Sequence, residues 1–239
     1  MSSPETPGHI AFICAMPMEL RPLVKKLGLQ KAEIGGVPVR SGLIGDRLAV
    51  AIVTGMGTAL ARRETERLLE VAEVDEVVVV GITGAVENET PIGTLVLPEV
   101  VVNSATGAEY RPGPRAQGVP RGKMWTTDGL TTNLDDIAKL RDQGVISLDM
   151  ETAAIAEVCE SRGIPWSVFR VISDRATDGS ITDEVFRLSH QDGTPDKAAV
   201  ARYFLKHPTH VARMAELARG AKLAAENAAN AAIEACFSK

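Results

Sequence analysis

The most informative stretch of this chain is residues 147–178, SLDMETAAIAEVCESRGIPWSVFRVISDRATD. Its pattern predicts a loop carrying Met150 and Glu151, a helix with a mostly apolar face, a Gly–Pro break, and a strand over residues 166–172. Such a run of β-branched and aromatic residues is typical of a central strand that is covered on both faces. The stretch therefore predicts helices packed on a sheet, and so an α/β protein.

Two acids of this stretch are expected to lie at one crevice. Asp174 directly follows the strand, and ligands of open α/β sheets bind outside the carboxyl ends of the strands. Glu151 precedes the helix, whose positive end stabilises a carboxylate. An Asp after a strand can also be a turn former or a helix cap. Because Met150 and Glu151 accompany it, we interpret Asp174 as functional.

The rest of the chain alternates strands and helices, which predicts one three-layer α/β domain over residues 9–239, with a mixed central β-sheet flanked by helices. The expected strands are 9–16, 37–44, 47–54, 76–82 and 93–102; the expected helices are 17–27, 58–71, 134–141, one starting near 195 and a longer alanine-rich one after 209. Residues 1–8 are polar and are expected to form a disordered tail.

Composition excludes several classes of protein. The chain has 239 residues, 45% of them apolar and 24% charged, which is ordinary for a soluble globular protein. A formal charge of −5 and the lack of a basic stripe with interleaved aromatic residues argue against nucleic-acid binding. No apolar run is long enough to span a membrane, and the first residues lack signal-peptide character. We expect a cytoplasmic protein with a small-molecule partner and no nucleic-acid or membrane partner.

Metal and cofactor sites are not indicated. The 3 cysteines, Cys14, Cys159 and Cys236, lie far apart and fit reduced, buried thiols better than disulfides or zinc ligands. His207 and His210 have helical spacing, but Pro208 intervenes and no third ligand is near. The sequence predicts neither a metal nor a cofactor.

A glycine-rich turn, TGMG, ends at Gly57 before a helix. Such a turn can present backbone N–H groups to a hydroxyl-rich or anionic ligand, although most such turns only reverse the chain. The G-x-G-x-x-G pattern of dinucleotide-binding folds is not completed here, because Leu60 stands at the third glycine position. We predict that Gly57 binds substrate.

The pattern D-M-E-x-A-A-I-A at 149–156, followed by V-I-S-D at 171–174, resembles the nucleoside phosphorylase superfamily. Within it, the sequence is most similar to the 5′-methylthioadenosine/S-adenosylhomocysteine nucleosidases. The resemblance implies that Met150 packs on the ribose and that Glu151 holds its 2′- and 3′-hydroxyls. It also implies that Asp174, after Ser173, protonates the purine at N7.

A third acid comes from the segment ICAMPMEL, residues 13–20, which resembles the A-M-x-x-E segment of the same nucleosidases. The resemblance implies that Glu19 activates the attacking water. The alternative is a solvated Glu in the first turn of a helix, a position that the helix dipole also favours. The segment GITGAV, residues 81–86, resembles the family turn that lies against the sugar and the nucleophile. This resemblance implies that Thr83 and Gly84 bind substrate.

The choice between water and phosphate depends on two turns. Hexameric phosphorylases of this superfamily carry a G-D-P-x-R turn, a second Arg, and a Ser that bind phosphate. In this chain the first turn has no Arg that matches the one in G-D-P-x-R. Val79 stands where the phosphorylases have their second Arg, and Ile82 stands where they have the Ser. Because a buried phosphate needs cations or many donors, hydrolysis is favoured. The nucleosidases usually keep that Ser as well, so Thr83 or Thr54 could supply a hydroxyl instead.

The base pocket is predicted around WTTDGL, residues 125–130. Family members often stack an aromatic side chain on the purine from this segment, but the matching position here is Leu130. Trp125 is either a nearby stacking partner or part of the core. Backbone groups around Leu130 are expected to read the edge of the base.

The segment 103–122 is rich in Gly, Pro and Arg, and loops of this length are usually functional or disordered. We interpret it as a lid that carries Tyr110, Arg111 and Arg115. In the dimers of the family, a partner chain encloses part of the 5′ end of the substrate. We therefore expect a homodimer.

The predicted function is hydrolysis of the N-glycosidic bond of a 5′-substituted purine nucleoside with release of adenine or a related purine. Residues 192–219 resemble the tail of the hopanoid-associated phosphorylases, which leaves the 5′ substituent open. One alternative is a phosphate-dependent phosphorylase, including one for an adenosylhopane-type substrate. Another is a purine-nucleoside-binding protein without turnover.

Overall fold

The computed structural model describes residues 9–113, 118–179 and 181–237. The strands are β1 (His9–Cys14), β2 (Gln30–Ile34), β3 (Val37–Ile44), β4 (Arg47–Val53), β5 (Glu76–Ala85), β6 (Leu95–Val96), β7 (Val100–Asn103), β8 (Glu109–Tyr110), β9 (Lys123–Thr126), β10 (Val145–Asp149) and β11 (Trp166–Arg175). The helices are α1 (Pro17–Leu27), α2 (Thr58–Val71), α3 (Leu134–Asp142), α4 (Thr152–Ser161), α5 (Asp183–Phe186), α6 (Lys197–Lys206), η1 (Pro208–His210) and α7 (Val211–Phe237).

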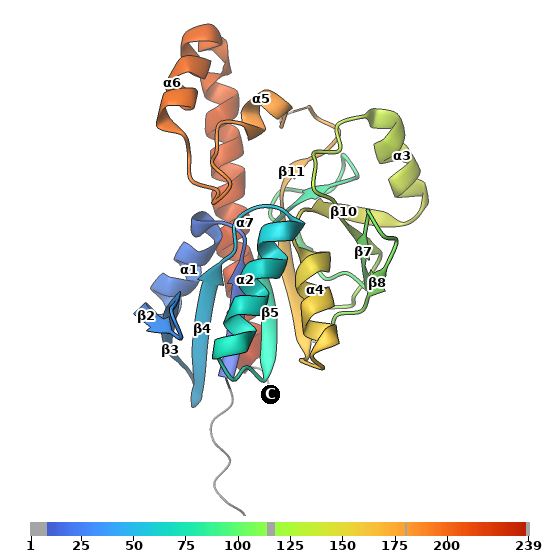
Figure 1. Ribbon diagram of the computed structural model, residues 1–239. Coiled ribbons are helices and arrows are strands. Elements are labelled where there is room, and N and C mark those ends of the chain that lie inside the picture. The colour runs from blue at the N-terminus through green and yellow to red at the C-terminus, as the bar shows by residue number, and fades with distance from the viewer. Residues whose placement is uncertain (1–8, 114–117, 180, 238–239) are drawn as a thin grey trace, which may run out of the picture.

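One mixed sheet is covered by helices on both faces (Figure 1), which confirms the predicted fold class. Alternation along β5 explains the layers. Val77 and Val79 join the core beneath α2 and α4, whereas Val78 and Val80 join the core beneath α1 and α7. Successive side chains of a strand point to opposite faces, so a continuous valine run suits a strand that is buried on both sides. No helix in the described ranges is long and apolar enough to cross a membrane.

On one edge of the central strand β5, two different strands pair with its two ends, and the unpaired stretch between them, residues 80–83, is named the fork. The other edge of β5 pairs in parallel with β11 from Val77 to Ala85. On the forked edge, β5 pairs with β1 only as far as Val79 and with β10 only from Gly84. Between these two pairings, the described chain places no strand beside residues 80–83 on this edge. Side chains must therefore satisfy the backbone polar groups of this short stretch.

Several sequence expectations need correction. The strand starting at residue 76 continues to Ala85, so GITGAV is extended strand and not a turn. The strand expected over 93–102 is split into β6 and β7, because Pro98 interrupts the pairing between them. β2 and α5 were not predicted, since β2 is short and mostly polar and α5 has only four residues. The helices α1 and α2 have the predicted bounds, and Asn133 caps α3. Residues 1–8 lie outside the described residues.

Candidate active site

A cavity of about 300 Å³ opens at the fork of β5. It collects residues from the turn after β1, from β5, from the loop before α4 and from the end of β11. Nearly all of the predicted site residues line it: Glu19, Thr83, Gly84, Leu130, Met150, Glu151, Ser173 and Asp174. The carboxyl ends of parallel strands meet here, as expected for ligand sites in α/β sheets.

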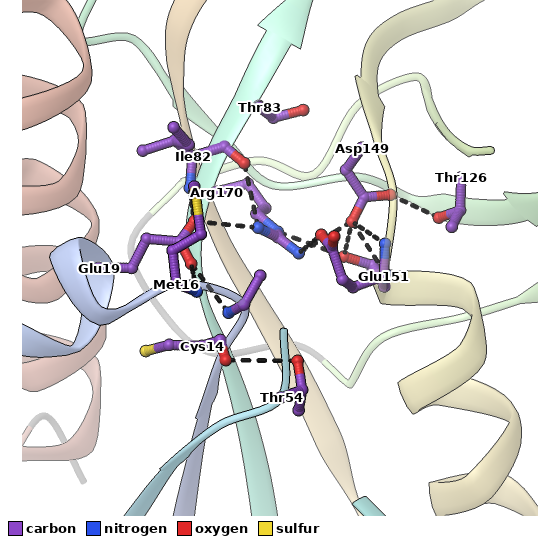
Figure 2. Close-up of polar contacts among 12 residues, drawn as sticks. Cys14, Met16, Glu19, Thr54, Ile82, Thr83, Thr126, Asp149, Glu151 and Arg170 are labelled. Carbon is purple, nitrogen blue, oxygen red and sulfur yellow. Dashed lines mark hydrogen bonds and ion pairs between the residues drawn. The ribbon is translucent and has the colours of Figure 1, made fainter. Parts of the chain in front are cut away.

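Glu19 lies in the first turn of α1 and is completely buried. Its Oε2 atom accepts hydrogen bonds from the N–H groups of Ala15 and Met16, both at 2.8 Å. Its Oε1 atom accepts one from the N–H of Ile82, also at 2.8 Å, so the carboxylate takes the place of a strand partner in the fork. Figure 2 shows this carboxylate turned toward β5. The alternative of a solvated Glu19 is wrong.

Arg170 is the central residue that the sequence interpretation missed. It lies in β11, is 2% exposed, and its guanidinium reaches three carboxylates (Figure 2). The Nη1 atom lies 3.4 Å from Glu19 Oε1, and the Nη2 atom lies 2.9 Å from Asp149 Oδ2 and 3.1 Å from Glu151 Oε2. A charge inside a strand that is buried on both faces requires such partners. That mismatch between residue type and expected burial was the available signal.

Arg170 also donates from Nη1 to the carbonyl oxygen of Ile82, at 3.0 Å. The fork therefore uses Glu19 for the N–H and Arg170 for the C=O of the same residue. Gly81, the residue before it, leaves space for both side chains. A Cβ atom at Gly81 would lie 2.3 Å from Glu19 Oε1 and 2.5 Å from Arg170 Nη1. Only glycine fits between these groups.

Glu151 occupies the N-cap position of α4, as predicted, and is buried. Its Oε1 atom accepts a hydrogen bond at 2.9 Å from the N–H of Gly57, which adopts a positive φ of 97°. Gly57 was predicted to bind substrate, but it does not line the cavity and its N–H is already used. Its place in the structure is that of a residue that orients Glu151.

The cluster is rich in negative charge, with Glu19, Asp149 and Glu151 around one guanidinium. Burial raises the pKa of Glu151 to about 7; Arg170 opposes this rise, and the charge of Asp149 adds to it. Burial also raises the pKa of Glu19, while Arg170 and the three N–H donors oppose the rise. Both groups are thus better proton acceptors than a solvated carboxylate.

Asp174 stands at a β-bulge at the end of β11. The register with β5 shifts between Ile172 and Asp174, and a bulge of this kind re-aims a side chain. The hydroxyl of Ser173 donates to Asp174 Oδ1 at 2.5 Å. Gly84 lies close by, since a Cβ atom there would be 3.3 Å from Asp174 Oδ2. Burial raises the pKa of Asp174, Ser173 opposes the rise, and Asp178 adds to it.

Neither threonine supplies a free hydroxyl proton in place of the missing serine. The Thr83 hydroxyl donates to the carbonyl oxygen of Leu148 at 2.7 Å. The Thr54 hydroxyl donates to the carbonyl oxygen of Gly55 at 2.9 Å, and Thr54 does not line the cavity.

The remaining wall of the cavity is largely apolar. It includes four methionines and two residues of the unpredicted helix α5: Met16, Met18, Met56, Met150, Val185 and Phe186. Trp125 packs instead with Ile137 and Leu140 under α3, so it belongs to the core and does not stack on a ligand.

The segment 103–122 lies away from this cavity. None of its described residues lines the wall. Tyr110 belongs to β8, and the N–H of Arg111 donates to Glu160 Oε1 of α4 at 3.3 Å. Arg115, also assigned to the predicted lid, lies outside the described residues. Within one chain, α5 therefore forms the part of the cavity wall that this segment was expected to form.

The two histidines considered as metal ligands have other partners. His210 Nδ1 lies 2.8 Å from the Tyr203 hydroxyl, and His207 Nε2 lies 3.4 Å from Glu184 Oε1. In the part of the chain that the structure describes, no group of three or more His, Cys, Asp or Glu side chains is arranged to hold a metal ion.

The family model described as "Phosphorylase superfamily" matches residues 9–121 and 118–206. The chain belongs to this superfamily. Both matched ranges together contain Glu19, Glu151, Arg170 and Asp174, so the superfamily core and the cavity coincide.

Relatives within the superfamily share one description. The 5′-methylthioadenosine/S-adenosylhomocysteine nucleosidase of Bacillus cereus (strain B4264) is 27% identical over 199 residues, covering 70% of this chain and 86% of the relative. The enzyme of that description from Oceanobacillus iheyensis is 26% identical over 198 residues, covering 70% and 86%.

Solved structures show the same fold. The nucleosidase of Helicobacter pylori in complex with a pyrrolopyrimidine inhibitor superposes with a TM-score of 0.74 at 14% identity, covering 97% of this chain and 99% of that one. Futalosine hydrolase of the same organism gives a TM-score of 0.70 at 14% identity, covering 94% and 95%.

Proposed function

We propose that this chain hydrolyses the N-glycosidic bond of a 5′-substituted adenine nucleoside, such as 5′-methylthioadenosine or S-adenosylhomocysteine. The observation that carries the proposal is the convergence on one cavity of two buried carboxylates, Glu19 and Glu151, and of the half-buried Asp174. The relatives at 26–27% identity, which are nucleosidases for these two substrates, support the same reaction.

Glu19 is the proposed general base. Its raised pKa suits a group that takes a proton from water. As the water oxygen forms its bond to C1′, the C1′–N9 bond breaks and its electron pair goes to the purine. Removal of the water proton by Glu19 leaves ribose with a neutral hydroxyl at C1′.

Asp174 is the proposed general acid. Burial keeps its carboxyl protonated to a higher pH than usual, so it can deliver a proton to N7 as the base departs. Glu151 is the proposed ribose ligand: its raised pKa marks a strong hydrogen-bond acceptor for the 2′- and 3′-hydroxyls. A nearby carboxylate also stabilises the cation-like sugar of the transition state, as in glycoside hydrolysis.

Water is favoured over phosphate by the charge around the fork. Arg170 is shared among three carboxylates, and a phosphate dianion beside them would meet net negative charge. Arg175 also lines the cavity, but its Nε atom donates to the carbonyl oxygen of Thr90.

The proposal is tested by incubating the protein with 5′-methylthioadenosine, S-adenosylhomocysteine, adenosine and inosine, with and without phosphate, and measuring free base. Adenine release at equal rates with and without phosphate is expected. Strict dependence on phosphate would identify a phosphorylase, and binding without release would identify a binding protein; either result overturns the proposal.

The acid is tested by Asp174→Asn. General acid catalysis accelerates a reaction by a factor of about 10² to 10⁴, so the rate of base release should fall by a factor in this range or more. The melting temperature should not fall, since the amide fills the same space. Ser173→Ala is the matched control, because it removes the hydroxyl that bonds to Asp174 and to the carbonyl oxygen of Thr83 but keeps the carboxyl of Asp174, and it should retain most of the activity. Near-normal release by Asp174→Asn contradicts the assignment.

We further propose that the enzyme is cytoplasmic and a homodimer. The dimer is supported by the position of segment 103–122, whose described residues do not line the cavity of their own chain. The small-molecule substrate and the reduced state of the three buried cysteines fit the cytoplasm.

A further inference from the structure

Charge is distributed unevenly along the chain. Residues 197–222, named the basic arm, hold six Lys or Arg and a single acidic residue, Glu216. The rest of the chain holds 20 basic and 30 acidic residues. The arm comprises α6, η1 and the beginning of α7, and it stands clear of the sheet in Figure 1. A strongly positive projection thus extends from an acidic body.

The outward face of α6 combines basic and aliphatic residues. With 3.6 residues per turn, its exposed residues span one side of the helix, with Ala198, Ala201 and Leu205 in the middle and basic residues at both edges. The edges are formed by Lys197, Arg202 and Lys206. Leu205 is 85% exposed, and the opposite side of α6 is turned inward at Tyr203.

In the described part of the chain, none of these basic side chains forms a salt bridge, although the charge of Arg202 helps to lower the pKa of Asp196 after the hydrogen bonds from the N–H groups of Ala199 and Ala198. The salt bridges found there join other groups, such as Arg47 with Glu76 and Arg62 with Glu157. Lys197, Arg202 and Lys206 are exposed and remain available to an anionic surface. Charge complementarity therefore points to a negatively charged partner.

The arm is fixed to the wall of the cavity. Asp196 caps α6 by accepting hydrogen bonds from two backbone N–H groups, at 2.9 and 3.0 Å. The rings of His207 and His210 stack with centroids 4.9 Å apart, and His207 Nε2 lies 3.4 Å from Glu184 Oε1 of α5. Since the two residues after Glu184 line the cavity, the arm lies next to the catalytic centre.

We propose that the basic arm docks the protein on the surface of an anionic lipid bilayer, with the exposed face of α6 toward the lipids. Lys and Arg are attracted to the anionic headgroups and can lay their alkyl stems along the interface, while Leu205 enters it. A nucleic acid fits less well, because the middle of this face is aliphatic and offers no ring to stack on bases. The expectation of no membrane partner rests on the lack of a membrane-spanning run and of signal-peptide character, and neither excludes binding to the surface of a bilayer.

The test is co-sedimentation of the full chain with vesicles of phosphatidylcholine alone and of phosphatidylcholine mixed with phosphatidylglycerol. Binding only to the anionic vesicles is expected. It should weaken as salt is raised from about 0.1 M to about 1 M, since the Debye length falls from about 10 Å to about 3 Å. The double variant Arg202→Gln, Lys206→Gln should bind about 25-fold more weakly, or about fivefold for each charge removed.

The matched control is Lys25→Gln, Lys26→Gln, which removes two exposed charges from the last turn of α1 and should bind like the wild type. Equal losses in both double variants, equal binding to both kinds of vesicle, or no binding overturn the proposal. Tighter binding to single-stranded RNA than to anionic vesicles would assign the arm to nucleic acid and also overturn it. Adenine release from a soluble nucleoside should be unchanged in both variants, so this test and that of the proposed function fail independently.

Discussion

Arg170 is the counter-charge of Glu19, Asp149 and Glu151 at the fork of β5. Removing one member of a buried ion cluster leaves uncompensated charge and costs about 3–5 kcal/mol of stability. Arg170→Met should therefore lower the free energy of unfolding by about that amount in urea titrations at neutral pH. The control Arg63→Met removes an exposed partner of Glu64 and should cost less than about 1 kcal/mol. Similar losses in the two variants would show that Arg170 is not the balancing charge.

Glu151 makes stability depend on pH. Its pKa is raised from 4.5 in the unfolded chain to about 7 in the folded protein, so the folded state binds more protons between these values. Protonation of Glu151 therefore adds to the free energy of unfolding by about 1.4 kcal/mol for each unit by which the pKa is raised. This stabilisation is fully present below pH 4.5 and is lost as pH rises to about 7. Urea unfolding of wild type and Glu151→Gln across this range should differ in slope, with the wild type falling more steeply. Parallel curves would contradict the raised pKa.

At the scale of elements, β5 is shaped by its glycine at the fork. In Gly81→Ala, the new Cβ would meet the carboxylate of Glu19 and the guanidinium of Arg170, both of which are fully packed. We expect adenine release to fall at least tenfold and stability to fall by about 1–3 kcal/mol, the usual cost of overpacking. Gly129→Ala is the control for stability, because its Cβ meets nothing within 4 Å. Unchanged activity in Gly81→Ala would mean that Glu19 can move without loss.

Elements were predictable from sequence where a single period governed them. α1, α2 and β11 followed from apolar spacing and from Gly and Pro signals, because their burial is decided locally. β2 carries mostly polar, exposed residues and α5 has only four residues, so neither has a sequence pattern long enough to identify it. The extension of β5 to Ala85 depends on pairing with β10 and β11, which are contacts of long sequence separation.

At the scale of the whole molecule, the candidate site joins segments that are far apart in the chain. Glu19 and Ile82 are 63 residues apart, and Glu19 and Arg170 are 151 apart, yet each pair is in contact. The acids could be proposed from motifs. The role of Arg170 could not, because it depends on three carboxylates that converge only when β5 pairs with both β1 and β11.

The expected homodimer is also a property of the whole molecule. The described residues of segment 103–122 do not line the cavity of their own chain, and one of them, Val119, is an apolar residue that is 87% exposed. If this segment packs on a second chain, the mass in solution should be twice 25.4 kDa, and Val119→Glu should shift the protein toward the monomer. The control Leu43→Glu changes an exposed residue of β3, 64% exposed, and should remain dimeric. Light scattering after size exclusion measures the masses. A fully active wild-type monomer would contradict the dimer, because the cavity would then need no second chain.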